Sequence, residues 1–282
     1  MLTIGIVSPG AMGSALGRAW SAGGARVVAT VEGRSERTRG LAHGLELLPA
    51  LTDVARTADV VVSICPPASA GAVLDDVIVA AGDARPLVAD LNAVSPGTMT
   101  DLEARAAEAG FVLVDGSISG GPPVAGGDTM VYLSGSRAAV LAELPADGLR
   151  TRLVGDRVGN ASAVKMCTAS VYKGTTAVWA QALQTAYVLG VLDVVLDDLA
   201  EEHPTEVARA ARRIAMSTSK SQRFVGEMEQ IALTQGHAGV SPELFAGMAA
   251  VYDRLATTEL ASLSPEDAAA LTDLEAVLQR LR

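Results

Sequence analysis

Residues 5–13 read GIVSPGAMG and stand between an apolar run, residues 2–7, and a helical pattern, residues 11–22. A turn that binds a dinucleotide needs a tight bend, a glycine that lets the pyrophosphate approach the backbone, and a glycine where helix meets strand. Gly10 and Gly13 match the second and third requirements. Ser8 replaces the first glycine and can make the bend if its φ stays negative. The helix start presents free N–H groups and a positive dipole end to phosphates. The alternative is a tight turn without a ligand; we assign a dinucleotide to Ser8, Pro9, Gly10, Ala11, Met12 and Gly13.

Short apolar runs alternate with helical patterns through the first half of the chain. The predicted strands are residues 2–7, 26–31, 59–64, 86–91 and 111–115, followed by 129–134 and 151–154. The predicted helices between them are residues 11–22, 36–44, 68–81 and 96–109. This alternation is typical of βαβ units. We therefore predict an α/β fold: an N-terminal Rossmann domain with a doubly wound parallel sheet.

The sequence changes character after Gly159, where strand-like alternation ends and Ala and Leu recur at helical spacing. One helix is expected from residue 161 to about residue 192, and Pro204, Pro242 and Pro265 each stand at the start of a further helix. We predict a Rossmann domain over residues 1–157 and an all-α domain over residues 158–282. Because a long apolar helix needs cover on every face, a homodimer through this interdomain helix is expected, a self-contained monomer being the alternative.

Bulk composition excludes several classes of protein. The formal net charge is −10 with scattered acidic residues, which disfavours nucleic acid because duplex binding needs clustered Lys and Arg. Cys65 and Cys167 stand in apolar surroundings, which indicates buried free thiols in a reducing compartment. The start of the chain lacks a basic region typical of a signal peptide, and Gln181, Gln184 and Asp193 interrupt the most apolar later stretch. A soluble cytoplasmic protein without a membrane span is expected.

The choice of cofactor is made after the second predicted strand. Glu32 favours NAD, since an acidic side chain there can hold the ribose 2′-hydroxyl. Arg34, Ser35 and Arg37 favour NADP, because a guanidinium can clamp the 2′-phosphate. The basic side chains outnumber the acidic one, so NADP is predicted ahead of NAD. The alternative for Arg37 is a solvated charge on a helix.

Several motifs, in order and spacing, resemble those of the β-hydroxyacid dehydrogenases, the group related to phosphogluconate dehydrogenase and the imine reductases. The resemblance covers nearly the whole chain. It comprises Gly10-x-Met12-Gly13, the basic turn Gly33-Arg34-Ser35, the segment Asp90–Pro96, the motif Asp115–Gly121, and Lys165 early in the long helix. The C-terminal helical half looks like a less well characterised branch, with the run Arg223 to Met228.

The resemblance implies roles for residues outside the glycine-rich turn. Ser119, Gly120 and Gly121 would bind the substrate, and exposed N–H groups of two adjacent glycines suit a carboxylate or carbonyl oxygen. Asn92 would lie where the chain passes the nicotinamide, and Cys65 and Pro66 are assigned to the cofactor. Lys165 is the only charged residue between Arg157 and Lys173 and would exchange a proton with the substrate. The alternatives are a flexible turn for 119–121 and a solvated lysine for Lys165.

Three positions depart from the family pattern. Ala169 stands where the family has Asn one turn after the lysine, and Ala161 stands where it has Gly. Glu227 falls in the segment where hydroxyacid enzymes carry a Lys-Asp pair. An acidic group there would repel a carboxylate and attract an amine or iminium, with Tyr172 as a second candidate contact. The alternative for Glu227 is exposure to solvent.

These features predict an NADP-dependent oxidoreductase that transfers hydride between the nicotinamide and a small hydroxy acid or carbonyl compound. One alternative is an imine reductase acting on C=N. Another is a sensor protein that binds NADPH without turnover, for which Ala169 leaves room. His43, His203 and His237 lack metal-ligand spacing, so no metal is expected. The remaining partner expected is the small-molecule substrate.

Overall fold

The computed structural model describes residues 2–281 and contains two compact units, which divide between Met166 and Cys167. The division falls inside the long helix α7 (Asn160–Leu189). The domain boundary predicted at residue 157 lies just before the first turn of this helix. Each unit has its own packing, so we describe the two in turn.

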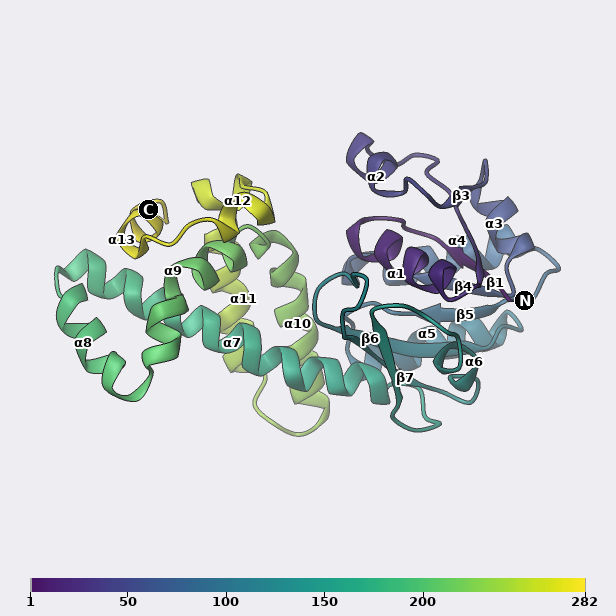
Figure 1. Cartoon of the computed structure of the whole chain (residues 1–282). Helices are drawn as coiled ribbons and strands as arrows, with labels where there is room; N and C mark the ends of the chain where they lie inside the picture. Colours follow the sequence, from purple (N-terminus) through teal and green to yellow (C-terminus); the bar gives the residue numbers. More distant parts are fainter. Residues whose placement is uncertain (1, 282) are drawn as a thin grey trace. The chain divides into compact units, whose positions relative to one another are not determined.

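The first unit is built on an eight-stranded sheet with the order β3-β2-β1-β4-β5-β6-β7-β8 (Figure 1). The strands are β1 (Thr3–Ile6), β2 (Arg26–Ala29), β3 (Glu46–Leu47), β4 (Val60–Ser63), β5 (Leu87–Asp90), β6 (Leu113–Ser119), β7 (Thr129–Ser134) and β8 (Leu149–Leu153). Strands β3-β2-β1-β4-β5-β6 are parallel and reverse their order between β1 and β4, as in a dinucleotide-binding fold. The predicted Rossmann architecture is confirmed.

Helices cover both faces of this sheet, whose central strands are mostly apolar. They are α1 (Ala11–Ala22), α2 (Glu36–Leu41), α3 (Leu51–Thr57), α4 (Ala70–Ala81), α5 (Pro96–Glu108) and α6 (Ala139–Ala142), with a 3₁₀ turn at Pro67–Ser69. Leu16 and Trp20 of α1 pack on one face with Leu141 of α6. Helices α3, α4 and α5 fill the other face, for example through Leu74 and Leu102. Burial on both faces explains the unbroken apolar runs of the strands.

Two details of the first unit differ from the prediction. Strand β7 runs antiparallel to β6, so the sheet is mostly rather than wholly parallel. The segment between them, residues 120–128, contains no helix and is too short for a parallel crossover. Strand β6 also continues to Ser119, so only Gly120 and Gly121 of the motif Asp115–Gly121 lie beyond the strand. The short elements β3, α3 and α6 were not predicted, since two to seven residues carry little periodic signal.

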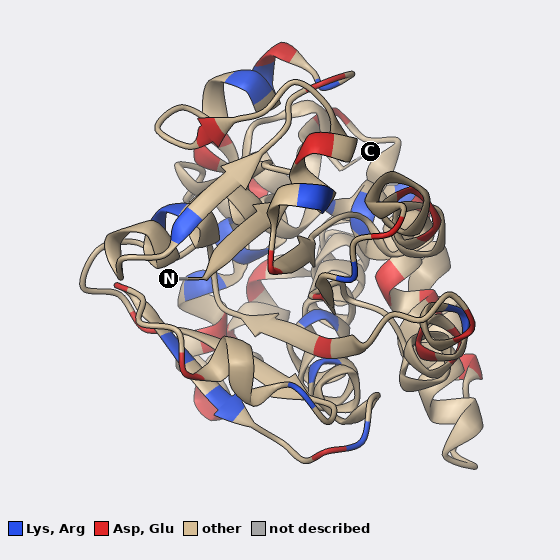
Figure 2. Ribbon diagram, turned by 90° about the vertical axis from the view of Figure 1, so that its right-hand side faces the viewer, with Lys and Arg blue, Asp and Glu red and all other residues tan. Residues whose placement is uncertain are grey.

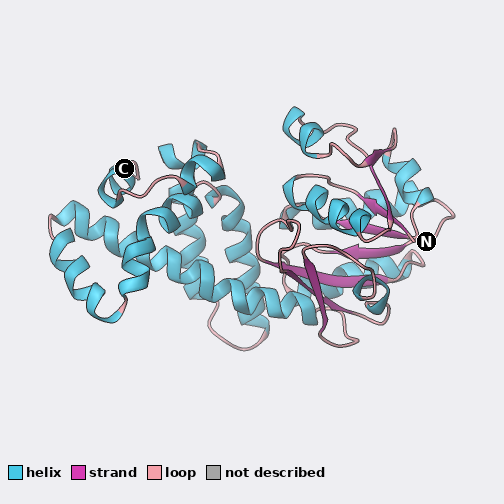
Figure 3. Cartoon of the chain, in the orientation of Figure 1, coloured by secondary structure: helices cyan, strands magenta, loops and turns pink. Residues whose placement is uncertain are grey.

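The second unit is helical throughout (Figure 3). After α7 come α8 (Leu192–Glu202), α9 (Pro204–Thr218), α10 (Ser221–His237), α11 (Glu243–Ala256), a 3₁₀ turn at Glu259–Ser262, α12 (Pro265–Ala269) and α13 (Leu274–Gln279). Helices α9 and α12 begin at the predicted prolines, and Pro242 caps α11. The core of this unit includes Leu183, Ile214, Met228 and Tyr252, each almost fully buried. The predicted helical domain is confirmed.

Charged residues of both signs are dispersed along strands and helices (Figure 2). Within residues 2–281, no helix has the length and apolar composition to cross a membrane. Both cysteines are free thiols. The expectation that both are buried is wrong: Cys65 is half-buried, and Cys167 is exposed because it lies on an outward face of α7.

Candidate functional site

The predicted cofactor and substrate residues of the first unit gather at one edge of its sheet. Strands β1, β4, β5 and β6 are parallel, so their carboxyl ends share that edge. The glycine-rich turn follows β1, Cys65 and Pro66 follow β4, Asn92 follows β5, and Ser119 ends β6. In open α/β sheets, ligands bind outside the carboxyl ends of the strands, next to the point where the strand order reverses.

The glycine-rich turn has the geometry that a dinucleotide phosphate requires. A Cβ on Gly13 would lie 2.3 Å from the Ser8 carbonyl oxygen, so only glycine allows the helix to start so close to the strand. A Cβ on Gly10 would meet nothing within 4 Å, so this residue faces open space. No side chain caps α1, whereas Ser35 and Ser95 cap α2 and α5 of the same unit. The uncapped helix start therefore suits an anionic ligand.

Ser8 makes the bend in the way that the sequence predicts, without a positive φ. None of the described non-glycine residues has a positive φ, so Ser8 makes the bend without strain. The helix braces the turn from inside, since the Ser14 hydroxyl donates to the Pro9 carbonyl oxygen at 2.5 Å. A serine thus fits where a glycine is more usual.

The turn after β2 brings a basic side chain back toward the glycine-rich turn. Gly33 adopts φ +67°, and the Arg34 guanidinium donates to the Val7 carbonyl oxygen at 3.4 Å. Ser35 caps α2 by accepting from the Thr38 amide. Arg37 and Glu32 are exposed. Of the three predicted phosphate contacts, Arg34 is the one whose side chain reaches the loop after β1.

A further basic residue, Arg39, lies at this turn and was not predicted. The Arg39 guanidinium donates to the Arg34 carbonyl oxygen at 3.1 Å, so its charge lies beside the same turn. Its position on the second half of a short helix gave no local signal. The geometry adds Arg39 to the candidate 2′-phosphate contacts.

Asn92 is the centre of a buried polar cluster at the ends of β4 and β5. Its Oδ1 accepts from the Cys65 amide at 2.5 Å, and its Nδ2 donates to Ser63 Oγ at 3.1 Å and to Asp90 Oδ2 at 2.7 Å. Burial raises the pKa of the Cys65 thiol to about 11, so this thiol stays protonated near neutral pH. The structure thus ties together Cys65 and Asn92, two residues assigned to the cofactor from separate motifs.

Asp90 is expected to make stability fall as pH rises. Burial raises its pKa from 3.8 to about 7, the charge of Asp115 adds to this, and the two hydrogen bonds from Asn92 oppose it. The native state thus keeps a proton that the unfolded chain has lost, so its stabilisation is present below about pH 4 and disappears as pH passes about 7. We expect Asp90→Asn to flatten the pH dependence of the unfolding free energy, measured in urea at pH 5 and pH 8. Exposed Asp101→Asn is the control, and an unchanged slope in Asp90→Asn contradicts the assignment.

Lys165 and the motif after β6 meet in the folded unit. The Lys165 ammonium donates to the carbonyl oxygen of Ile118 at 2.6 Å, which places it beside Ser119. Gly120 adopts φ +112°, and Thr129 Oγ1 holds the Gly121 carbonyl oxygen at 3.0 Å. The loop is therefore fixed at Gly121 rather than freely flexible, and the ammonium group lies at its start.

A buried carboxylate, Asp115, fixes the start of α7 and thereby the place of Lys165. Asp115 is fully buried, and its oxygens accept from the Ser134 hydroxyl, the Gly159 amide, and both the amide and hydroxyl of Ser162. Ser117 Oγ donates to the Ala161 carbonyl oxygen at 2.7 Å. A carboxylate is favourable at a helix N-terminus. Asp115 stands in the motif Asp115–Gly121, but nothing in the sequence pattern marks it as the anchor of α7.

Glu227 and Tyr172 belong to the helical unit. Glu227 is buried and forms an ion pair with Lys173 and a second one with Arg223, whose Nε lies 3.1 Å from Oε1. Exposure to solvent, the alternative for Glu227, is therefore wrong, because two cations hold this carboxylate in the interior. Tyr172 is 65% exposed and lines a cavity of this unit. No group of three or more His, Cys, Asp or Glu side chains within residues 2–281 is placed to hold a metal ion.

Two protein families match parts of this chain. Residues 3–146 match the NAD binding domain of 6-phosphogluconate dehydrogenase, which covers the sheet edge described above. Residues 186–255 match a domain of unknown function, DUF1932. The "uncharacterized 28.5 kDa protein in 7S RNA 5′ region" of Methanothermus fervidus is 29% identical over 204 residues, 71% of this chain and 78% of its own length.

Solved structures resemble the chain over nearly its full length. A conserved protein of unknown function, itself similar to 3-hydroxyacid dehydrogenases, is 26% identical with a TM-score of 0.67, over 90% of this chain and 97% of that one. The 3-hydroxyisobutyrate dehydrogenase of Mycobacterium tuberculosis is 20% identical with a TM-score of 0.69, over 100% and 99%. An imine reductase from Myxococcus stipitatus is 21% identical with a TM-score of 0.56, over 100% and 99%. The last two likenesses show the shared fold.

Proposed function

The chain belongs to the family of the NAD binding domain of 6-phosphogluconate dehydrogenase, among the NAD(P)-dependent oxidoreductases of the β-hydroxyacid dehydrogenase type, and from this premise we propose that it is an NADP-dependent reductase or dehydrogenase of a small carbonyl or hydroxy acid compound. The observation that carries the proposal is the Lys165 ammonium, 2.6 Å from the Ile118 carbonyl oxygen and beside Ser119, at the sheet edge where the glycine-rich turn also lies. A proton donor and a dinucleotide cradle at one edge suit hydride transfer to a carbonyl.

The chain's own residues then have separate tasks. The start of α1 and the turn at Arg34 bind the phosphates, and the bound nicotinamide cofactor supplies the hydride. Ser119 and the amides of Gly120 and Gly121 orient the substrate oxygen. Lys165 gives that oxygen a proton during reduction and takes it back in the reverse direction. Asp115 anchors the start of α7. The Lys165 ammonium is therefore held in position before the reaction, and the helix does not have to move.

Imine reduction is the second candidate function, and the contacts of Glu227 argue against it. A carboxylate that attracts an iminium needs uncompensated charge. Lys173 and Arg223 both pair with Glu227, so the group is already neutralised. A positively charged Lys165 beside Ser119 likewise suits a carbonyl oxygen better than a cation. We therefore propose that hydride is transferred to and from a C=O bond.

One experiment tests both the cofactor and the turnover. We expect NADPH to bind more tightly than NADH in fluorescence titrations. Arg34→Ala should weaken the affinity for NADPH by about tenfold or more and leave the affinity for NADH unchanged, because a charge-assisted contact to the 2′-phosphate is lost. Arg137→Ala, a change at an exposed arginine that is assigned to no site, is the matched control. Oxidation of NADPH is then followed with carbonyl compounds and cyclic imines, and reduction of NADP+ is followed with hydroxy acids.

Each outcome of that experiment has a clear reading. Turnover of carbonyl compounds alone supports the proposal, and turnover of imines alone assigns the protein to C=N chemistry. Tight NADPH binding without turnover of any compound indicates a sensor. If neither dinucleotide binds, the proposed function is wrong.

We also propose that the protein works as a homodimer through α7. Apolar side chains of this helix stay exposed in the single chain, among them Val171, Val178 and Leu189, each more than half exposed. A second copy would cover them. Light scattering during gel filtration measures the state directly. The cytoplasmic location stays a prediction.

A further inference from the structure

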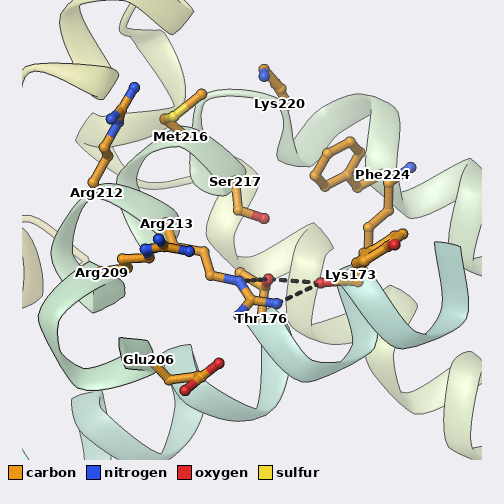
Figure 4. Close-up of a pocket in the computed structure, with 11 residues that line it drawn as sticks. Lys173, Thr176, Glu206, Arg209, Arg212, Arg213, Met216, Ser217, Lys220 and Phe224 are labelled. Carbon is orange, nitrogen blue, oxygen red and sulfur yellow. Dashed lines mark hydrogen bonds between the residues drawn. The ribbon is translucent and has the colours of Figure 1, made fainter. Parts of the chain in front are cut away.

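The helical unit contains a cavity of about 670 Å³ whose walls come from α7, α9 and α10 (Figure 4). Tyr172, Lys173 and Thr176 line it from α7, and Lys220 and Phe224 close its other end. The volume is that of a site for a small molecule. Neither the dinucleotide site nor the proposed substrate loop uses these residues.

The lining of this cavity is strongly cationic in a chain whose net charge is −10. Helix α9 contributes Arg209, Arg212 and Arg213, which share one face because they are three and four residues apart. Lys173 and Lys220 add two further positive charges. Among the described residues that line the cavity, Glu206 is the one acidic residue.

Two of these cations have internal partners. Arg213 is bound to α7: its Nε donates to Thr176 Oγ1 at 2.7 Å, and its Nη2 donates to the Tyr172 carbonyl oxygen at 3.0 Å (Figure 4). Lys173 pairs with Glu227 and lies 4.3 Å from the centre of the Phe224 ring. These contacts hold the side chains of Arg213 and Lys173 against α7 and α10. The charge of Lys173 is compensated by Glu227.

The other three cations, Arg209, Arg212 and Lys220, form no salt bridge with any residue in the described range 2–281. Burial and the neighbouring Arg223 lower the pKa of Lys220, and Glu266 opposes this shift. Positive charge is thus concentrated at the cavity without an equal number of carboxylates. An anion bound in the cavity would supply the missing negative charge.

The placement of lysine in the sequence supports the same reading. The chain has three lysines, Lys165, Lys173 and Lys220, and none of them is on the open surface. The exposed positive charges are arginines. Two of the three lysines line this cavity, and the third is the proposed proton donor. All three lysines are thus partly buried, and two of them line the same cavity.

We propose that this cavity binds a small molecule through a phosphate or carboxylate group, held by Arg209 and Arg212 of α9 together with Lys220. Guanidinium groups bind both anions through paired N–H donors. The apolar wall at Met216 and Phe224 takes the uncharged part of the molecule. This site is separate from the proposed substrate loop, and binding of the anion is measured without turnover.

The test compares two double variants of the full chain by calorimetry. Inorganic phosphate and malonate are titrated separately at constant ionic strength, with saturating NADPH so that the dinucleotide site is filled. Arg209→Gln with Arg212→Gln removes two cavity charges. Arg152→Gln with Arg157→Gln removes two exposed charges of the first unit and is the matched control. We expect the cavity variant to weaken anion binding by about tenfold or more, with the control unchanged.

The outcomes separate this proposal from its alternatives. A preference for phosphate or for malonate tells which anion the site takes. Equal affinity in both double variants overturns the proposal. A cavity variant that loses self-association in gel filtration assigns the arginines to a subunit interface, and this also overturns it. Failure of NADPH to bind contradicts the proposed function alone, because the comparison between the two double variants remains valid without it.

Discussion

Lys165→Met is expected to lower kcat by about 10²–10⁴-fold, the range of a lost general acid, while the Kd for NADPH stays within about twofold. The reason is geometric: the ammonium lies 2.6 Å from the Ile118 carbonyl oxygen, beside the loop that would hold the substrate. Methionine keeps most of the length of the side chain and removes the ammonium group. Steady-state kinetics and NADPH titration measure the two quantities on the same preparation.

Lys165→Arg is the informative control for this change. Arginine keeps the positive charge but does not release its proton near neutral pH. A role in proton transfer predicts that both variants lose kcat, whereas a role in charge alone predicts that arginine restores it. A methionine variant with the wild-type kcat would remove Lys165 from the mechanism.

The second large effect is on stability, at Asp115. Asp115→Ala is expected to lower the free energy of unfolding by about 3–5 kcal/mol, since it leaves the buried donors of Ser134, Gly159 and Ser162 without their acceptor. The side chain is fully buried and accepts four hydrogen bonds of 2.7–3.1 Å. Urea unfolding followed by circular dichroism gives this value.

Two variants make the Asp115 result specific. Asp115→Asn keeps the volume but replaces one acceptor with a donor, so its loss is expected to be smaller, about 1–3 kcal/mol. Asp156→Ala removes an exposed carboxylate close in sequence to the start of α7 and should change little. If Asp115→Ala behaves like Asp156→Ala, the carboxylate does not anchor α7.

The fold followed from the sequence because its signals are local. An apolar run, a glycine-rich turn and a helical pattern repeat often enough to predict β1, α1 and β2 within a few residues. The same locality explains the misses. Strand β3 has two residues, Glu46 and Leu47, and both are exposed, so neither periodicity nor burial marks them. The direction of β7 depends on the length of the preceding loop, which the pattern of the strand itself does not contain.

The candidate site was predicted in its parts but not in its connections. The sequence singled out Lys165 and Ser119, yet their juxtaposition depends on a hydrogen bond between residues 47 positions apart. Asp115 stands in a motif of the sequence, but the residues that donate to it are Ser134 of β7, Gly159 just before α7, and Ser162 in its first turn. Glu227 was open to two interpretations until the structure paired it with Lys173.

The sequence by itself determined the features that depend on near neighbours: a glycine-rich turn at Gly10 and Gly13, a mostly parallel Rossmann sheet, and a helical second half that begins near residue 160. Glycine conformation and the alternation of apolar residues act between near neighbours, so they can be read along the chain. Only the tertiary structure decided which charges are compensated. It neutralised Glu227, gave Asp115 its donors, and gathered the α9 arginines around one cavity, because the energy of a charge depends on its burial and on partners that are distant in the sequence.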